Sequence, residues 1–76
     1  MIKETCKIIW GGMPPTTCDL CREPITTEFV DGKTYWGPWA HMCFSCYLSD
    51  GSGLGNGMGQ LYRKDEESGN WVKVVG

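Results

Sequence analysis

The sequence predicts a small α+β domain whose apolar core needs an additional stabilising link. Three observations lead to this prediction: the chain has only 76 residues, it carries closely spaced cysteine pairs, and strand-like segments surround one helix-like segment. A chain of this length buries only about 60% of its unfolded surface, so core packing alone leaves marginal stability. Domains of this size usually add disulfides, a metal ion or a partner subunit. We therefore expect a single domain, residues 1–76, stabilised by one of these additional links.

The cysteines are the candidates for this stabilising link. Four of the five form two C-x-x-C pairs, Cys18 with Cys21 and Cys43 with Cys46. Two such pairs are a known zinc pattern, because each short turn points both of its sulfurs inward. Four thiolates then complete a closed tetrahedral site, which is structural because no position is left for water or substrate. We predict one structural Zn²⁺ bound by Cys18, Cys21, Cys43 and Cys46.

Other ligand sets and metals stay open. His41 lies two residues before Cys43 and could replace a cysteine, although both pairs are already complete without it. Cys6 lies outside both pairs and is interpreted as a small apolar strand residue. Iron could occupy the same four sulfurs, because a tetrahedral S4 site suits zinc or iron. A thioredoxin-like redox role is disfavoured, since that motif accompanies a βαβ unit that this pattern lacks.

The elements of the metal-binding core, residues 16–50, follow from local patterns. Residues 16–24 should form a knuckle around the first cysteine pair. Asp31-Gly32 lies between β-branched and aromatic residues, which predicts a hairpin with strands at 25–30 and 33–37. No glycine or proline occurs between Pro38 and Gly51, and apolar residues there recur at helical spacing. We therefore expect a short helix at 41–49 that ends before Gly51.

The flanking segments are expected to be extended. Residues 1–10 read as a short strand, and the C-terminal part, residues 60–76, as a hairpin of strands 60–64 and 70–75 around a polar turn. The expected elements follow the order of a treble-clef zinc finger: a knuckle, then a hairpin, then a helix that carries the second cysteine pair. The alternative is a zinc ribbon, in which the second pair would lie on another β-knuckle.

A glycine-rich connector, residues 51–59, joins the core to the C-terminal hairpin and has glycine at every second position. This spacing excludes the G-x-G-x-x-G and P-loop phosphate motifs, which need glycines at other offsets. Two interpretations remain. The connector is a flexible spacer, or it is an extended segment whose bare face lets another backbone or a flat ring approach closely.

The charge and hydropathy patterns bear on location and partners. Seven Lys and Arg against nine Asp and Glu give a net charge of −2, and a tetrathiolate zinc site would make it about −4. Such a chain is a poor non-specific nucleic-acid binder, because that affinity comes from neutralising phosphates. The sequence shows neither a signal-type apolar region nor a membrane span. We expect a cytoplasmic protein with reduced thiols and no membrane association.

Three stretches together resemble a set of small zinc-finger proteins encoded by tailed bacteriophages: CDLCREPI, FVDGKTYWGPWAHMCFSC and GLGNGMGQLY. The similarity extends over about residues 16–62. The resemblance implies a compact zinc domain, located in the host cytoplasm or in the virion, and carries over no catalytic residue.

The functional expectation is a non-enzymatic protein-binding module that binds a host factor or a virion protein. Four tryptophans exceed what a small core needs, and Trp and Tyr favour interfaces. The candidate binding surface consists of Trp36, Trp39, Tyr62, Arg63 and Lys64. The alternative is a nucleic-acid-binding zinc finger. Its basic face would consist of Arg22, Lys33, Arg63 and Lys64, and its stacking rings would be Tyr35, Trp36 and Tyr62. Enzymatic activity is not expected, because a single histidine and isolated carboxylates form no recognisable catalytic motif. The oligomeric state stays open.

Overall fold

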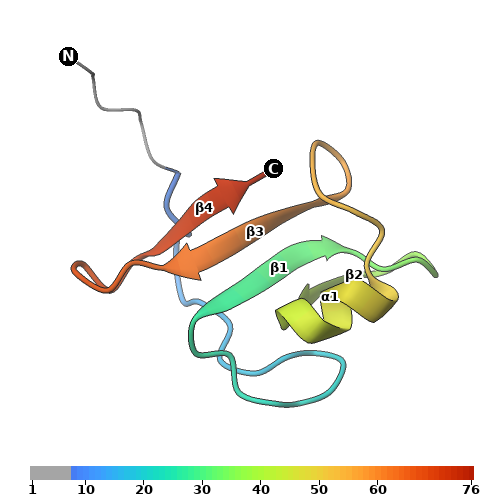
Figure 1. Ribbon diagram of the computed structural model, residues 1–76, viewed down its shortest axis with the longest axis horizontal. Helices are drawn as coiled ribbons and strands as arrows, with labels where there is room; N and C mark the ends of the chain where they lie inside the picture. Colours follow the sequence, from blue (N-terminus) through green and yellow to red (C-terminus); the bar gives the residue numbers. More distant parts are fainter. Residues whose placement is uncertain (1–7) are drawn as a thin grey trace.

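The computed structural model describes residues 8–76 and has a small α+β fold (Figure 1). Its elements are β1 (Glu28–Lys33), β2 (Trp39–Met42), α1 (Phe44–Asp50), β3 (Gly59–Lys64) and β4 (Trp71–Val75). The strands form an antiparallel four-stranded sheet in the order β2-β1-β3-β4. The α+β prediction is confirmed, and so is the pairing of the two C-terminal strands.

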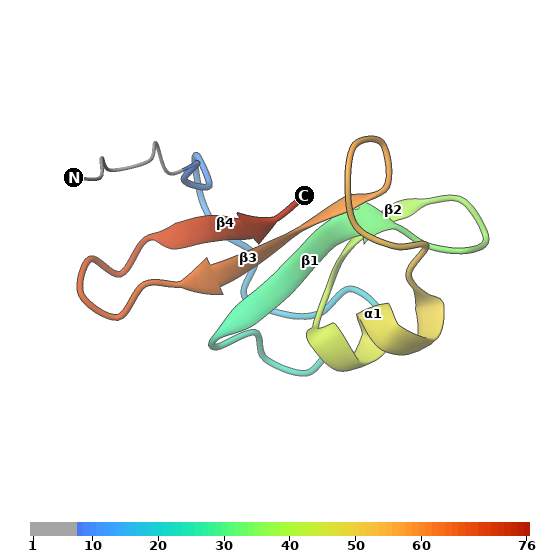
Figure 2. The same cartoon turned by 45° about the horizontal axis from the view of Figure 1, so that its top comes forward.

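Helix α1 packs on one face of the sheet, which we call the helix face. It lies over β1 and β2, its side chains pack against Leu61 of β3, and it does not extend over β4, as the two views agree (Figures 1 and 2). Beneath it, Val30, Met42 and Leu61 form a buried cluster against which Phe44 and Tyr47 pack. Burial of these apolar side chains is the main local force that holds the helix on the sheet.

The opposite face of the sheet is built from aromatic rings. Phe29 of β1 and Tyr62 of β3 are register partners, and their rings stack with centroids 5.3 Å apart. Trp10 packs edge-on against both rings, at 5.3 Å from Phe29 and 5.2 Å from Tyr62. The segment that carries Trp10 is held at β4 by two backbone hydrogen bonds, from Trp10 N to Trp71 O and from Lys73 N to Ile8 O. Residues 8–10 are therefore extended as expected, while residues 1–7 lie outside the described part of the chain.

The predicted hairpin turn at Asp31-Gly32 is wrong. Both residues lie inside β1, where Gly32 faces Ala40 on one side and Gly59 on the other. The turn instead occupies residues 34–38, where the second strand, 33–37, was expected. It is closed by Thr34, whose backbone N–H and Oγ1 both donate to the Pro38 carbonyl, at 2.9 and 2.7 Å. Thr34 is buried, so this side chain fixes the true turn from inside the fold.

The helix starts later than expected, at Phe44 rather than at residue 41. Residues 39–42 pair with β1 as β2, so they cannot also begin the helix. Cys43 is the N-cap with extended backbone, and Cys46 follows in the first turn. Gly51 ends the helix as expected, donating its N–H to the Tyr47 carbonyl at 2.8 Å. A Cβ at Gly51 would collide with the Tyr47 ring, which explains a glycine there.

The glycine-rich connector is neither an extended strand nor free of internal contacts. It folds into a loop in which Gly55 N donates to Gly59 O at 2.8 Å and Gly59 N donates to Gly55 O at 3.0 Å. Gly53 and Gly55 have φ values of +120° and +123°, a region that side-chain-bearing residues rarely adopt. Glycines in this loop therefore allow backbone conformations that other residues rarely adopt. The interpretation that a missing side chain lets another backbone approach closely holds only at Gly59, the first residue of β3.

Candidate metal centre

Four sulfur atoms converge where the loop before β1 meets the start of α1. The Sγ atoms of Cys18, Cys21, Cys43 and Cys46 all lie within 4.8 Å of one another. The distance between Cys21 Sγ and Cys43 Sγ is 3.8 Å. All four are free cysteines. The structure therefore brings together the whole cysteine set that the spacing predicted.

The first pair is presented by a tight turn. Cys18 N donates to Glu23 O at 2.9 Å, and Arg22 N donates to Cys18 O at 3.0 Å. Arg22 has a φ of 68°, so the chain reverses through a left-handed residue directly after Cys21. The turn is fixed to β2 because Asp19 N donates to His41 O and His41 N donates to Asp19 Oδ2. It therefore lies against the strand that leads into the second pair.

The second pair is presented by the start of the helix. Cys43 caps α1 and Cys46 lies three residues later, so the two side chains emerge on the same side. Cys43 N also donates to Cys18 Sγ at 3.3 Å, which links the two pairs through a backbone group. The strand-to-helix change at Met42 and Cys43 therefore aims the second pair at the first.

The environment of Cys18 favours its thiolate form. This side chain is fully buried, and burial alone would raise the pKa. Its Sγ, however, accepts hydrogen bonds from the backbone N–H groups of Leu20, Cys21 and Cys43, at 3.4, 3.5 and 3.3 Å. These donors outweigh burial and lower the pKa of Cys18 to about 6. The thiolate is the form of cysteine that binds metals.

Crowding has the opposite effect on Cys46. Burial raises its pKa, and the neighbouring sulfurs of Cys21, Cys43 and Cys18 raise it further. Four thiolates at this separation repel one another, so they cannot all ionise without a compensating positive charge. A divalent cation among the sulfurs would supply that charge, and the deprotonated thiolates would then be favoured over the thiols.

The sulfur geometry fits such a cation. A tetrahedral site with metal–sulfur bonds of about 2.3 Å places its sulfurs roughly 3.8 Å apart. The Cys21–Cys43 separation equals this value, and the remaining pairs lie within 4.8 Å. The donor set is entirely soft thiolate, which suits zinc or iron and not calcium or magnesium. The four cysteines could therefore hold one metal ion.

Of the two other candidate ligands, His41 does not belong to the cluster. Its Nε2 instead lies 3.5 Å from Asp31 Oδ1. The same ring packs edge-on against Trp10 at 5.3 Å. Cys6 lies outside the described residues.

The five residues of the expected binding surface do not form one surface. Trp36 and Trp39 are exposed, at 53% and 50%, beside the turn at residues 34–38. Arg63 and Lys64 lie at the other end of the sheet, since Arg63 is the register partner of Glu28 at the start of β1. Tyr62 is buried beneath Trp10, with only 8% exposure, so its assignment to a surface was wrong.

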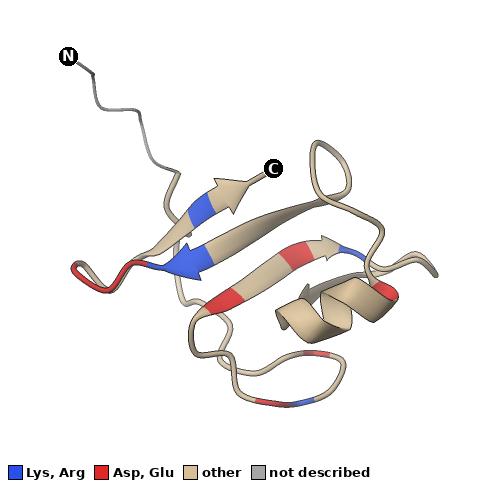
Figure 3. Cartoon of the chain, in the orientation of Figure 1, with Lys and Arg blue, Asp and Glu red and all other residues tan. Residues whose placement is uncertain are grey.

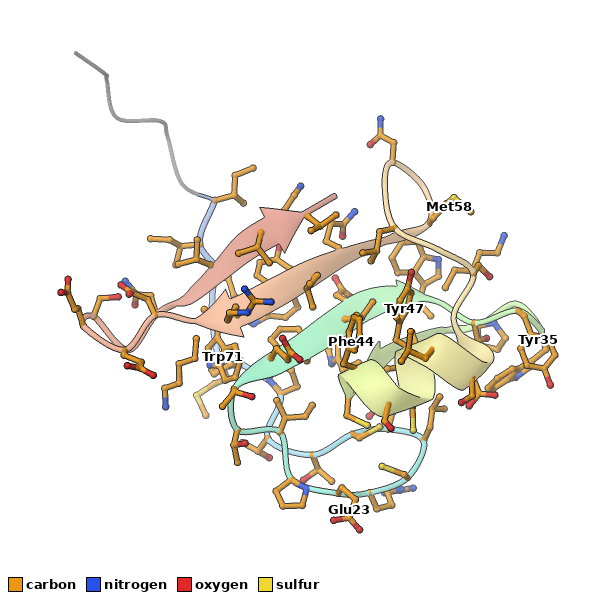
Figure 4. All side chains as sticks on the ribbon, in the orientation of Figure 1. Glu23, Tyr35, Phe44, Tyr47, Met58 and Trp71 are labelled. Carbon is orange, nitrogen blue, oxygen red and sulfur yellow. The ribbon has the colours of Figure 1, made fainter. Side chains whose placement is uncertain are left out.

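One exposed aromatic residue was named only for the nucleic-acid alternative and was left out of the expected protein-binding surface. Tyr35 is 70% exposed, and its ring centroid lies 5.2 Å from that of Trp36 at an angle of 76°. Figure 4 shows Tyr35 at the tip of the turn that follows β1. Its position directly before Trp36 and the Gly37-Pro38 pair was the signal that could have identified it. We call Tyr35, Trp36 and Trp39 the aromatic turn.

The described cations are interspersed with acidic groups. Arg63 forms a salt bridge with Glu28 at 3.3 Å, and Lys64 lies 6.0 Å from the centre of the Trp71 ring. Figure 3 shows the acidic turn at residues 65–67 directly after these two cations. Arg63 and Lys64 therefore do not extend into the basic face that the nucleic-acid alternative requires.

The chain matches no protein-family model, no curated protein and no solved structure. Within residues 8–76, no helix is both long and apolar enough to cross a membrane.

Proposed function

We propose that the protein is a small, non-enzymatic protein-binding module whose fold depends on one structural Zn²⁺. The observation that carries the proposal is the convergence of four cysteine sulfurs within 4.8 Å. Zinc is favoured over iron because it is the usual metal of closed four-cysteine structural sites. The order of turn, hairpin and helix, with the second pair at the helix start, supports the treble-clef type over the zinc ribbon.

The aromatic turn is the binding element of this proposal. Tyr and Trp are the residues that most often anchor protein interfaces, because each ring covers a large area with few rotatable bonds. The turn is held from both sides: Thr34 bonds to Pro38 O, and Tyr35 N donates to Asp50 O at 2.8 Å. A backbone that is already fixed has little conformational entropy left to lose on binding. The metal centre supports this geometry because it holds the start of the helix whose last residue contacts Tyr35.

Location and partner follow the resemblance to tailed-phage proteins as part of the same proposal. The partner would be a host factor or a virion protein, met in the host cytoplasm or in the virion. A reducing cytoplasm would keep the four thiols available for the metal.

The binding proposal is tested by comparing three baits in a lysate of the natural host. The wild-type chain should retain a partner that Trp36→Ala loses and Leu48→Ala keeps. Leu48 is the matched control, because it is 70% exposed on α1 and is not part of the aromatic turn. Equal recovery on the wild-type and W36A baits would argue against the aromatic turn.

A second assay covers the nucleic-acid alternative. Single- and double-stranded oligonucleotides are titrated at low salt, where phosphate-driven binding is strongest. The acidic net charge and the Arg63–Glu28 pair lead us to expect no binding. Salt-sensitive binding that is lost in Arg63→Ala would replace the protein-binding proposal.

A further inference from the structure

Among the described residues 8–76, no layer covers the part of the helix face formed by β4 and the end of β3. Helix α1 lies over β1 and β2 and contacts Leu61 of β3, while the end of β3, β4 and the segment paired with β4 are exposed on that side (Figures 1 and 2). Ile9 and Val72 are bridge partners there, and Val74 follows two residues later on the same strand. Ile9 is 48% and Val74 45% exposed. We call Ile9, Val72, Val74 and the neighbouring Arg63 the open face.

The open face is recessed and bordered by charge. Arg63, Val72 and Val74 line a hollow of about 280 Å³, together with Lys64 and Asp65. Arg63 projects on this side because its register partners are Val72 on β4 and Glu28 on β1. The apolar residues thus lie beside the Arg63–Glu28 ion pair, whose charged atoms are 3.3 Å apart, and beside Lys64 and Asp65.

We propose that the open face is the docking site for a second copy of this chain, related by a two-fold axis. In an isologous interface every group meets the equivalent surface of its partner, so the surface has to complement itself. A surface with Arg63 and Glu28 side by side does so, because the arginine of one copy can face the glutamate of the other in both directions. The branched apolar residues of the two copies meet in the centre, where they exclude water.

The shape of each copy supports the same arrangement. Stacked sheets pack about 10 Å apart, which is close to the thickness of a helix layer. Within residues 8–76, one part of each copy has two layers, the sheet and α1, and the part around β4 has the sheet alone. When two copies dock through their open faces, the β3–β4 ribbon of each copy supplies the second layer that the other lacks. This ribbon then lies in the same layer as the partner's α1, at a similar distance from the sheet.

Sedimentation equilibrium of the full chain over micromolar to millimolar concentrations tests the proposal. We expect reversible dimerisation in the wild type. Val74→Asp should raise the dissociation constant by about a hundredfold or more, because the two-fold axis buries the new carboxylate twice. Met13→Asp is the matched control, since Met13 is 88% exposed outside the open face, and it should dimerise like the wild type apart from a small charge effect.

A mixture of two charge-reversed variants tests whether the open face binds a second copy of the chain and not another partner. Glu28→Arg and Arg63→Glu should each be monomeric alone, because each places like charges across the axis. An equimolar mixture of the two should form a heterodimer, because every cross-copy contact again joins opposite charges. A wild-type chain that stays monomeric throughout, a mixture that does not associate, or equal dimerisation of V74D and M13D would overturn the proposal.

Discussion

Gly32 of β1 and Gly59 of β3 lie opposite each other, and a side chain at either position would press against the backbone of the other strand. A Cβ on Gly32 would lie 3.0 Å from the Gly59 Cα and 3.0 Å from the Met58 carbonyl oxygen. A Cβ on Gly59 would lie 3.1 Å from the Gly32 Cα. The close approach of these two strands is therefore a property of the glycine pair, which also explains why the Asp-Gly dipeptide does not form a turn.

The first prediction concerns this contact. Gly32→Ala should lower the free energy of unfolding by about 1–3 kcal/mol, because the obstructing atoms are backbone and the strands have to separate. Gly11→Ala is the control, since nothing lies within 4 Å of the atom that it adds. Urea denaturation of both variants measures the difference. Equal stability of G32A and the wild type would contradict the close approach.

The second prediction concerns the buried hydroxyl that closes the turn before β2. Thr34→Val keeps the shape of the side chain and removes the hydrogen bond from Oγ1 to Pro38 O, so we expect a loss of about 1 kcal/mol. Thr26→Val, at an exposed position, should cost much less. Thermal denaturation of the two variants gives the comparison, and equal effects would show that the Thr34 hydroxyl is not a structural contact.

The third prediction is a dependence on alkaline pH. Burial raises the pKa of Tyr62 above its ordinary value of 10.0, and the Asp31 carboxylate raises it further. The folded state therefore favours the neutral phenol. This contribution to stability is complete below about pH 10 and is lost as the pH rises through the pKa of the folded state. Denaturation at a series of pH values should show a shallower alkaline decline in Tyr62→Phe than in the wild type.

An exposed tyrosine provides the control for that experiment. Tyr35→Phe removes a hydroxyl from a residue that is 70% exposed, so its alkaline profile should follow that of the wild type. If Y62F and Y35F gave the same profile, Tyr62 would not be the group responsible.

The fourth prediction separates the cysteine cluster from the remaining cysteine. Cys46→Ser removes one of the four converging sulfurs, so it should weaken metal binding by orders of magnitude and abolish cooperative unfolding, because binding and folding are coupled in small metal sites. Cys6→Ser leaves both pairs intact and should bind metal like the wild type. Competition with a chromogenic chelator measures both affinities. A C6S variant as defective as C46S would mean that the ligand set is different.

Cysteine spacing predicted the candidate site well because metal-binding turns are local. Two residues between cysteines bring each pair of sulfurs together whatever the rest of the fold does, and the four-residue set converges as predicted. The two C-terminal strands were also predictable, because β-branched and aromatic residues there are interrupted by a clear polar turn.

The errors arose where long-range contacts override local preference. Asp31-Gly32 has the local signature of a hairpin turn, but its glycine is needed for the approach of β1 to β3, and buried Thr34 closes the turn further along. The helix was placed too early because residues 39–42 are recruited as β2. Tyr62 was placed on the surface because sequence does not reveal that Trp10 covers its ring.

Metal content is the most direct test of the central claim that one structural zinc holds this fold together. Native mass spectrometry of the purified chain, with elemental analysis, should find one zinc ion per folded molecule. Removing the metal with a chelator should unfold the domain, as seen in the near-ultraviolet circular dichroism of its aromatic residues, and adding zinc back should restore the signal. A metal-free chain that keeps the same spectrum and the same unfolding midpoint would contradict the claim.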